Sequence, residues 1–214
     1  MTASTAYKKW PLEKLPAWLL ADLRSDHAGE TGAVFIYRGI LSCSRDPEVR
    51  RFASEHLQTE WHHLEVLDRL LSKKSRSWLL PVWRVAGFLT GSLPALFGRR
   101  AVFATIAEVE RFVDSHYQEQ INQLDQQQLL PGIRALLEEF RQDEVEHRDE
   151  ASDLIGSRPG PLLRAWCKLV AIGAAAAVTL ARWRHPHRSG IQAESNRRGD
   201  SAVSGKIGGQ RCGF

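Results

Sequence analysis

The stretch TEWHHLEVL, residues 59–67, places an acid and a histidine on the apolar side of a predicted helix. Glu60 and His63 are three positions apart, so both side chains project from one helix face. The leucines that share this face are Leu57, Leu64, Leu67 and Leu71. Burying a carboxylate or an imidazole is costly unless the group is paired or bound to a metal ion. The stretch therefore predicts a buried helix with a partner for both side chains.

A second copy of this pattern occurs in DEVEH, residues 143–147, where Glu144 and His147 have the same spacing. Each glutamate–histidine pair is preceded, one predicted helix earlier, by a single acid on the apolar stripe. These acids are Glu30 before the first pair and Glu110 before the second. The chain therefore contains a weak internal repeat of two helical hairpins.

The repeat predicts a metal centre inside an all-α, ferritin-like four-helix bundle. One glutamate from each of two helices and Glu-x-x-His from each of the other two form the ligand set of di-iron and di-manganese carboxylate proteins. Four carboxylates nearly balance two divalent cations, and mixed oxygen and nitrogen ligation suits iron or manganese. A single Glu-x-x-His on a helix is more often a solvated pair, or a core histidine with a capping partner. Chance does not account for six such residues on inward-facing stripes at these spacings. The predicted ligands are Glu30, Glu60, His63, Glu110, Glu144 and His147.

Further acids and histidines lie close to these ligands. Asp26 and Asp143 are candidates for orienting the opposite ligand histidines, because a metal-bound histidine usually donates its other N–H to a carboxylate. Solvation at the surface is the alternative for both acids. The residues that fall off the apolar stripes are predicted to face solvent: Glu55, His56, His62, Glu65 and Glu146.

The domain organisation follows from helix signals. Five long helices are predicted, at about 16–43, 47–72, 101–126, 133–154 and 161–183. Asp46 is the expected N-cap of the second helix, and Pro47 its first helical residue. The helical domain is expected over residues 16–184, after an N-terminal segment, 1–15, and before a disordered basic tail, 185–214.

Composition excludes several classes of protein. Most of the net charge of +4 arises from residues after Pro186. The positive net charge of the chain therefore gives little support for a nucleic-acid partner. The cysteines Cys43, Cys167 and Cys212 form no CxxC, which argues against a disulfide scaffold, a zinc finger or a built-in rubredoxin or iron–sulfur centre. A reducing compartment is expected, and the N-terminus lacks the apolar run of a signal peptide.

Two apolar segments accompany the bundle. Residues 77–98 join the second and third predicted helices and are interrupted by proline, glycine and arginine, and the last helix, 161–183, is apolar between basic flanks. Neither contains an uninterrupted apolar run of the ~18 residues expected of a spanning helix. Either both segments pack as ordinary core, or they form a surface that enters one membrane leaflet, with tryptophans at headgroup depth.

The motifs that carry a family resemblance are RSDHAGETGAVFIYRG (24–39), EWHHL (60–64), VERFVDSHYQEQI (109–121) and FRQDEVEHRDEA (140–151). Together they resemble the demethoxyubiquinone hydroxylases of ubiquinone biosynthesis, over about residues 16–184. The resemblance places that family's two iron ions on the six predicted ligands. His116 and Tyr117 match an HY pair of the family, which implies a part in proton or electron delivery, although Tyr117 fits a packed core position equally well. Besides this pair, the catalytic residues expected are Glu30, Glu60, Glu110 and Glu144.

The resemblance implies an O₂-dependent monooxygenase that hydroxylates the ring of a polyprenyl methoxy-methyl-benzoquinol. It also implies peripheral attachment to the cytoplasmic face of a bacterial membrane or the matrix side of the mitochondrial inner membrane. An external electron donor, with NADH as a candidate, and other ubiquinone-biosynthesis proteins are the expected partners. We further expect an opening to the metal centre between the helices that carry Glu30 and Glu110. The alternative function is a ferritin- or rubrerythrin-like iron oxidase or peroxidase.

Overall fold

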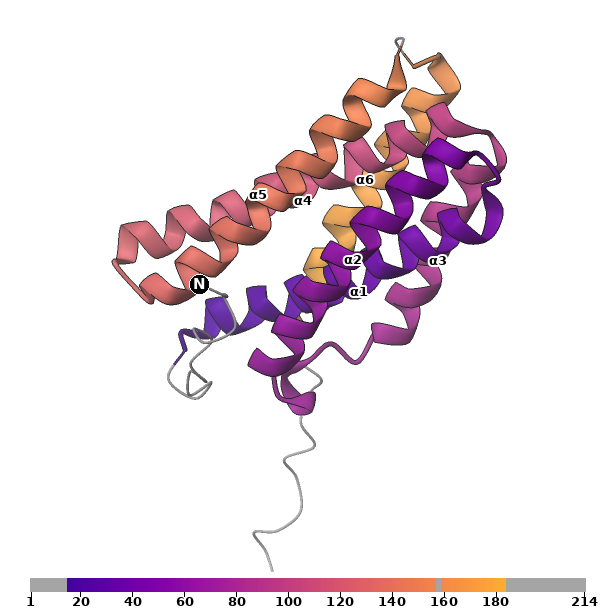
Figure 1. Ribbon diagram of the computed structural model, residues 1–214. Helices are drawn as coiled ribbons and strands as arrows, with labels where there is room; N and C mark the ends of the chain where they lie inside the picture. Colours follow the sequence, from indigo (N-terminus) through magenta and orange to yellow (C-terminus); the bar gives the residue numbers. More distant parts are fainter. Residues whose placement is uncertain (1–14, 157–158, 184–214) are drawn as a thin grey trace, which may run out of the picture. The chain divides into compact units, whose positions relative to one another are not determined.

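The computed structural model describes residues 15–156 and 159–183, and within these ranges all regular structure is helical (Figure 1). The predicted tail and nearly all of the predicted N-terminal segment lie outside the described residues. The helices are α1 (Ala17–Cys43), α2 (Pro47–Leu70), α3 (Leu80–Leu96), α4 (Arg99–Gln127), α5 (Pro131–Ile155) and α6 (Pro161–Arg182), with a 3-10 turn at Lys73–Ser75. The all-α prediction is confirmed.

The start of α2 shows how the sequence sets a helix boundary. The side chain of Asp46 accepts hydrogen bonds from the backbone N–H groups of Glu48 and Val49, at 2.9 and 3.2 Å. Pro47 follows within the first turn, where a backbone N–H would have no helical partner in any case. The predicted cap is therefore confirmed.

The core consists of two apolar clusters separated by polar side chains. One cluster is built around Tyr37, Phe52 and Phe103, and the other around Tyr117 and Phe140. Along α1, α2, α4 and α5, each predicted ligand glutamate lies between a residue of one cluster and a residue of the other. The four helices therefore enclose a polar centre that apolar packing covers at both ends.

The segment 77–98 was not predicted as a helix, and this expectation is wrong, because it forms α3. Pro81 falls in the first turn of α3, where a missing N–H costs nothing. Gly87 and Gly91 face α1, where a Cβ would collide with the backbone of Gly32 or Ile36. These glycines therefore permit close approach of two helices; they do not break one.

Helices α3 and α6 leave much apolar surface exposed. In α6 only Ala181 is buried, so its packing is not that of an ordinary core helix. By length and composition alone, α6 could cross a membrane. Six residues of the segment 77–98 were expected to lie on an exposed apolar patch. Of these, Trp78, Phe88 and Leu89 are exposed, whereas Leu79, Leu80 and Trp83 are only partly exposed. The other large exposed apolar residues of α3, α6 and their flanks are Val82, Val85, Leu93, Leu96, Phe97, Leu162, Leu169, Ile172, Leu180 and Trp183.

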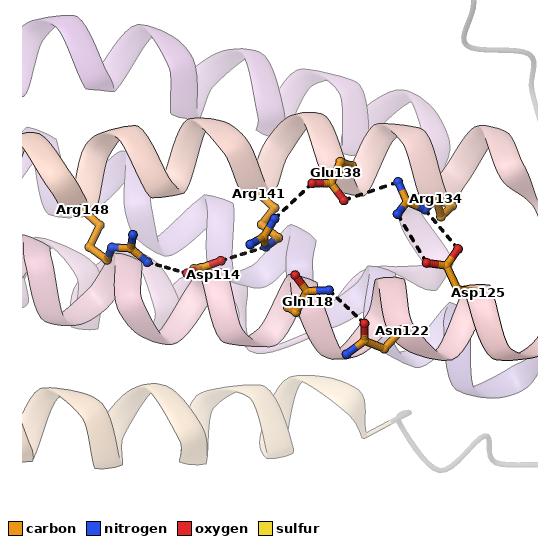
Figure 2. Close-up of polar contacts among 8 residues, drawn as sticks. All are labelled: Asp114, Gln118, Asn122, Asp125, Arg134, Glu138, Arg141 and Arg148. Atoms are coloured by element: carbon orange, nitrogen blue, oxygen red, sulfur yellow. Dashed lines mark hydrogen bonds and ion pairs between the residues drawn. The ribbon is translucent and has the colours of Figure 1, made fainter.

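Charged side chains join α4 to α5 along one face (Figure 2). Asp114 of α4 pairs with both Arg141 and Arg148 of α5. Further along, Arg134 of α5 pairs with Asp125 of α4 at 3.1 Å. Partly exposed pairs of this kind contribute ~0–1 kcal/mol each. They therefore favour one alignment of the two helices more than they stabilise the fold.

Candidate metal centre

The structure brings the six predicted ligands together as two overlapping groups. In each group, one ligand atom from every residue lies within 4.8 Å of the others. The first group is Glu30, Glu60, His63 and Glu144, and the second is Glu60, Glu110, Glu144 and His147. All six residues are buried, and Glu60 and Glu144 belong to both groups. This sharing is the arrangement expected of two adjacent ions with carboxylates between them.

Both histidines direct the same ring nitrogen to the centre. His63 Nδ1 lies 3.7 Å from Glu30 Oε2 and 3.4 Å from Glu144 Oε1. His147 Nδ1 lies 3.2 Å from Glu60 Oε1 and 3.6 Å from Glu144 Oε2. The three-residue spacing in each Glu-x-x-His places the acid and the imidazole on one helix face, so each helix contributes both donors.

Most of the oxygen and nitrogen atoms of this cluster that could bind metal lack a hydrogen-bond partner, which tests whether the residues fit metal ions. Both carboxylate oxygens of Glu60 and of Glu144 are buried without a partner, as are Glu30 Oε2 and the Nδ1 atoms of His63 and His147. Buried polar atoms are normally satisfied, and unsatisfied ones are costly. Two cations would satisfy all of them at once, so the residues fit the predicted ligand role.

The pKa values of the buried glutamates also indicate that the cluster needs positive charge. Burial, followed by the charges of neighbouring glutamates, raises the pKa values of Glu60 and Glu110 well above their ordinary range. Burial also opposes ionisation of Glu144, but the close His147 and His63 rings, whose Nδ1 atoms lie 3.6 and 3.4 Å from its oxygens, prevail and lower its pKa to about 2. Protons on the histidines therefore supply positive charge that metal ions would supply when bound.

One of the two predicted orienting contacts is present. Asp143 accepts a hydrogen bond from His63 Nε2 at 2.9 Å, which leaves Nδ1 of this ring to face the centre. Asp26 does not contact His147, so that prediction is wrong. Asp26 instead lies 3.2 Å from His116 of α4, because its position one turn before Glu30 faces α4 and not α5.

His56 is also placed differently from its prediction. It is 8% exposed, its ring packs 4.0 Å from that of His147, and its Nε2 pairs with Glu150 at 2.8 Å. Burial and the neighbouring His147 lower the pKa of His56 to about 4. The prediction of a solvent-facing side chain is wrong because α5 covers this side of α2. The residues that are exposed as predicted are Glu55, His62, Glu65 and Glu146.

Two buried tyrosines each donate a hydrogen bond to a ligand glutamate of the other hairpin. Tyr117 donates to Glu30 at 2.5 Å, and Tyr37 donates to Glu110 at 3.1 Å. Burial and the nearby carboxylates raise the pKa values of both hydroxyls, which therefore keep their protons. Sequence reasoning missed this role for Tyr37. The available signal was its position seven residues after Glu30, which matches that of Tyr117 after Glu110.

A cavity of about 390 Å³ opens onto this cluster. It lies between α1 and α4, where an opening was expected, and α3 and α6 complete its wall. The α6 side consists of apolar and small residues between Trp166 and Ala181. Glu30, Glu60, Glu110 and Glu144 reach the cavity, and Ser25, Asp26 and His116 form a second polar region beside them. The cavity therefore suits a mainly apolar ligand with a polar head.

Comparisons with known proteins agree with this arrangement. The sequence signature of the family described as "Ubiquinone biosynthesis protein COQ7" matches residues 17–181. A 3-demethoxyubiquinol 3-hydroxylase of Rhodospirillum rubrum is 38% identical over 68% of this chain and 69% of its own length. The NADPH-dependent mitochondrial 3-demethoxyubiquinone 3-hydroxylase of Dictyostelium discoideum is 32% identical over 74% of each chain. A 3-demethoxyubiquinol 3-hydroxylase of Acinetobacter baumannii is 31% identical over 72% of this chain and 77% of the relative.

Proposed function

This chain belongs to the COQ7 family of ubiquinone biosynthesis proteins, and we propose that it is a 3-demethoxyubiquinol 3-hydroxylase with two iron ions. The observation that carries the proposal is the buried cluster of unpartnered carboxylate and imidazole donors beside an apolar cavity. An iron store or a peroxidase needs no such cavity for an apolar ligand. The names of the relatives also favour a hydroxylase over the iron oxidase or peroxidase considered as the alternative.

The proposed ligands are the four glutamates and two histidines of the overlapping groups. When bound, the two irons would supply the activation of O₂ that ring hydroxylation requires. The protein would hold its donors in place: Asp143 orients His63, while Tyr117 and Tyr37 orient Glu30 and Glu110. Because these partners lie on the opposite hairpin, each half of the bundle restrains the ligands of the other half.

The cavity would receive the quinol ring and exclude water around it. Its wall is apolar apart from the carboxylate cluster and the polar region at His116. Each CH₂ of a prenyl tail that leaves water contributes ~0.8 kcal/mol, so the tail favours the apolar surfaces of α3 and α6. Small residues of α6, such as Gly173 and Ala177, leave room between that helix and the bundle. We place the ring near Glu30 and Glu110 and the tail along α6.

The exposed apolar faces of α3 and α6 support peripheral attachment to a membrane. Their large apolar side chains are exposed within the described residues, and Trp78 and Trp183 lie at their borders. Tryptophan prefers the interface between headgroups and acyl chains. We propose that these faces enter one leaflet on the cytoplasmic side of a bacterial membrane, or on the matrix side in a mitochondrion. The electron donor would be external, with a nicotinamide nucleotide as the candidate.

The proposal is tested with purified protein reconstituted anaerobically with ferrous iron. A demethoxyubiquinol with a short prenyl tail, O₂ and NADH should yield a product one oxygen atom heavier, measured by mass spectrometry with ¹⁸O₂. A deletion strain should accumulate the demethoxy-quinone and recover when the gene is returned. Oxidation of ferrous iron without any labelled quinol would overturn the hydroxylase proposal and favour the iron oxidase.

A further inference from the structure

The polar region beside the metal centre contains a histidine held by three residues. Nε2 of His116 lies 3.2 Å from Asp26 Oδ1 and 3.2 Å from Ser25 Oγ. Gln120 donates its own hydrogen bond to the same Asp26 oxygen at 2.8 Å. The ring of Phe112 stacks on the imidazole with an interplanar angle of 10°. Asp26, Ser25 and Gln120 are 4% exposed or less, so this network is shielded from bulk water.

These contacts determine which nitrogen of His116 carries the proton. The hydroxyl of Ser25 donates to the backbone carbonyl of Asp22 at 2.8 Å, so toward His116 its oxygen acts as an acceptor. The oxygen of Asp26 is also an acceptor. Nε2 faces two acceptors and must therefore be the N–H. In the neutral ring, Nδ1 then holds the lone pair, and within the described residues it has no hydrogen-bond partner.

Charged groups around His116 come from two helices. Asp22, one turn before Asp26 on α1, pairs with Arg182 of α6 at 2.7 Å, so its charge is largely balanced. Burial lowers the pKa of His116, but the hydrogen bond and charge of Asp26 outweigh it and the pKa ends above its ordinary value. Asp26 is therefore the acid that governs both the orientation and the protonation of the ring.

From this geometry we propose that Asp26 is a positioning residue that presents His116 Nδ1 to the cavity as an acceptor for a hydroxyl of the quinol ring. The proposal rests on the proposed function, because it concerns the same substrate. A quinol has O–H groups that can donate to Nδ1, whereas the oxidised quinone offers only carbonyl acceptors. A site built around an acceptor rejects a ligand that lacks the donor. The Asp26–His116 pair would thus select the reduced form of the ring.

The site lies at the right distance from the metal cluster for this role. Asp26 precedes Glu30 by one helical turn, about 5 to 6 Å along α1. Tyr117, the residue after His116, donates to Glu30. A ring lying against the carboxylates can therefore place one of its oxygens near His116 while its other side faces the metal ligands.

The first test measures binding to the metal-free protein, so that iron chemistry does not change the ligand. Because Asp26 raises the pKa of His116, three probes are compared in a pH series that extends to alkaline pH, and the preference should appear once the imidazole becomes neutral. Binding is followed by quenching of tryptophan fluorescence, since Trp83 and Trp166 line the cavity. The probes are a short-tailed demethoxy-hydroquinone kept anaerobic, its quinone, and its di-O-methyl ether. We expect the hydroquinone to bind about 10- to 100-fold more tightly than the other two.

Substitutions test whether Asp26 causes the preference for the hydroquinone. Asp26→Asn should reduce the preference to about twofold, and Asp26→Glu should restore part of it. Asp68→Asn is the matched control, because Asp68 bonds a buried histidine, His27, at 2.9 Å outside the cavity wall. This control should retain the full preference. Equal binding of hydroquinone and quinone to the wild type, or a full preference in Asp26→Asn, would overturn the proposal.

A second readout does not depend on the variants folding. In ¹⁵N-histidine spectra of the metal-free wild type, recorded at a pH high enough for the ring to be neutral, His116 should show protonated Nε2 and unprotonated Nδ1, and added hydroquinone should shift Nδ1. Protonation on Nδ1 in the neutral ring would overturn the inference. If the iron-loaded enzyme fails to hydroxylate the quinol, only the proposed function is contradicted. If it hydroxylates the quinol but the metal-free protein shows no preference for the hydroquinone, only this inference is contradicted.

Discussion

The two halves of the candidate metal centre are built alike but have different surroundings. Each half supplies a glutamate, a Glu-x-x-His pair and a tyrosine seven residues beyond the first glutamate. One turn before Glu30, however, stands Asp26, which binds His116, whereas one turn before Glu110 stands Ile106, fully buried in an apolar cluster. The repeated features hold the candidate metal ligands, and the differences supply the polar region of the cavity.

The helices added to each half differ as well. After the first hairpin, α3 packs on α1 so closely that Gly87 and Gly91 have no room for a Cβ. After the second hairpin, hydrogen bonds and ion pairs tie α6 to the bundle, from Trp166 to Thr105 at 2.8 Å and from Arg182 to Asp22 at 2.7 Å. The close packing of α3 on α1 and the looser packing of α6 therefore leave a cavity beside α6 that a ligand can enter.

The largest effect is expected from removing a ligand that both halves share. Glu144 belongs to both candidate groups, whereas Glu30 belongs to one. Glu144→Ala should therefore abolish binding of both irons and all hydroxylation. Glu30→Ala should retain about one iron per chain, also without hydroxylation. Iron content by mass spectrometry after reconstitution distinguishes the two variants, and equal iron content in both would contradict the shared position of Glu144.

A methyl group between α1 and α3 should be the next most damaging change. A Cβ on Gly91 would overlap the carbonyl oxygen of Ile36, so Gly91→Ala must separate two helices and should cost about 3 kcal/mol. Gly173→Ala in α6 is the matched control, because no atom lies within 4 Å of its Cβ, and it should stabilise by ~0.5–1 kcal/mol. Urea denaturation of both variants measures the difference, and a similar loss in both would disprove tight packing at α3 alone.

The metal-free protein should become less stable as pH rises, on account of Glu60 and Glu110. The unfolded chain releases these protons near the ordinary value of 4.5, but the folded protein retains them because burial and neighbouring carboxylates raise both pKa values. Between the two pKa values the folded state binds more protons, so stability falls with rising pH. At about pH 7.5, Glu110→Gln should therefore stabilise the metal-free protein by ~2–4 kcal/mol, and the gain should vanish near the unfolded pKa.

Glu144 should have the opposite effect on the pH dependence of stability, because its pKa is lowered and not raised. Its folded pKa of about 2 lies below its ordinary value, so its contribution is present at neutral pH and is lost as pH falls through the folded pKa. Glu144→Gln should thus destabilise the metal-free protein at neutral pH. Thermal denaturation over a pH series separates the variants. Loss of stability in Glu110→Gln at neutral pH would show that no proton is held there.

The smallest effects should come from the matched tyrosines. Tyr37→Phe and Tyr117→Phe each remove one hydrogen bond to a ligand glutamate and should each cost about 1–2 kcal/mol. Only Tyr117 lines the cavity, so its loss should also lower turnover by about tenfold, while Tyr37→Phe should stay within about twofold. Equal turnover in the two variants would indicate that the halves are functionally alike.

The clustering of the six candidate ligands was predictable, because periodicity within a single helix is enough to place each Glu-x-x-His pair on one face. Glu60 with His63, and Glu144 with His147, each need only three-residue spacing to share a face. The predicted cap at Asp46 follows equally from a local signal. The contact between His63 and Asp143 joins two helices, but it was suggested by the position of Asp143 beside the candidate ligand Glu144. The helix boundaries of α1, α2, α4, α5 and α6 also lie close to those expected.

Contacts between helices were harder to predict, because they depend on how each helix is rotated and how far it is shifted against its neighbour. The sequence of α1 alone does not reveal that Asp26 meets His116 or that Tyr37 reaches Glu110, and that of α2 does not reveal that α5 covers His56. The glycines of α3 likewise resembled helix breakers until α1 was seen to pass against them. The sequence by itself therefore determined which residues offer metal donors. Only the tertiary structure decided which donors share an ion site, which residues orient them, and where the cavity opens, since helix packing sets those distances.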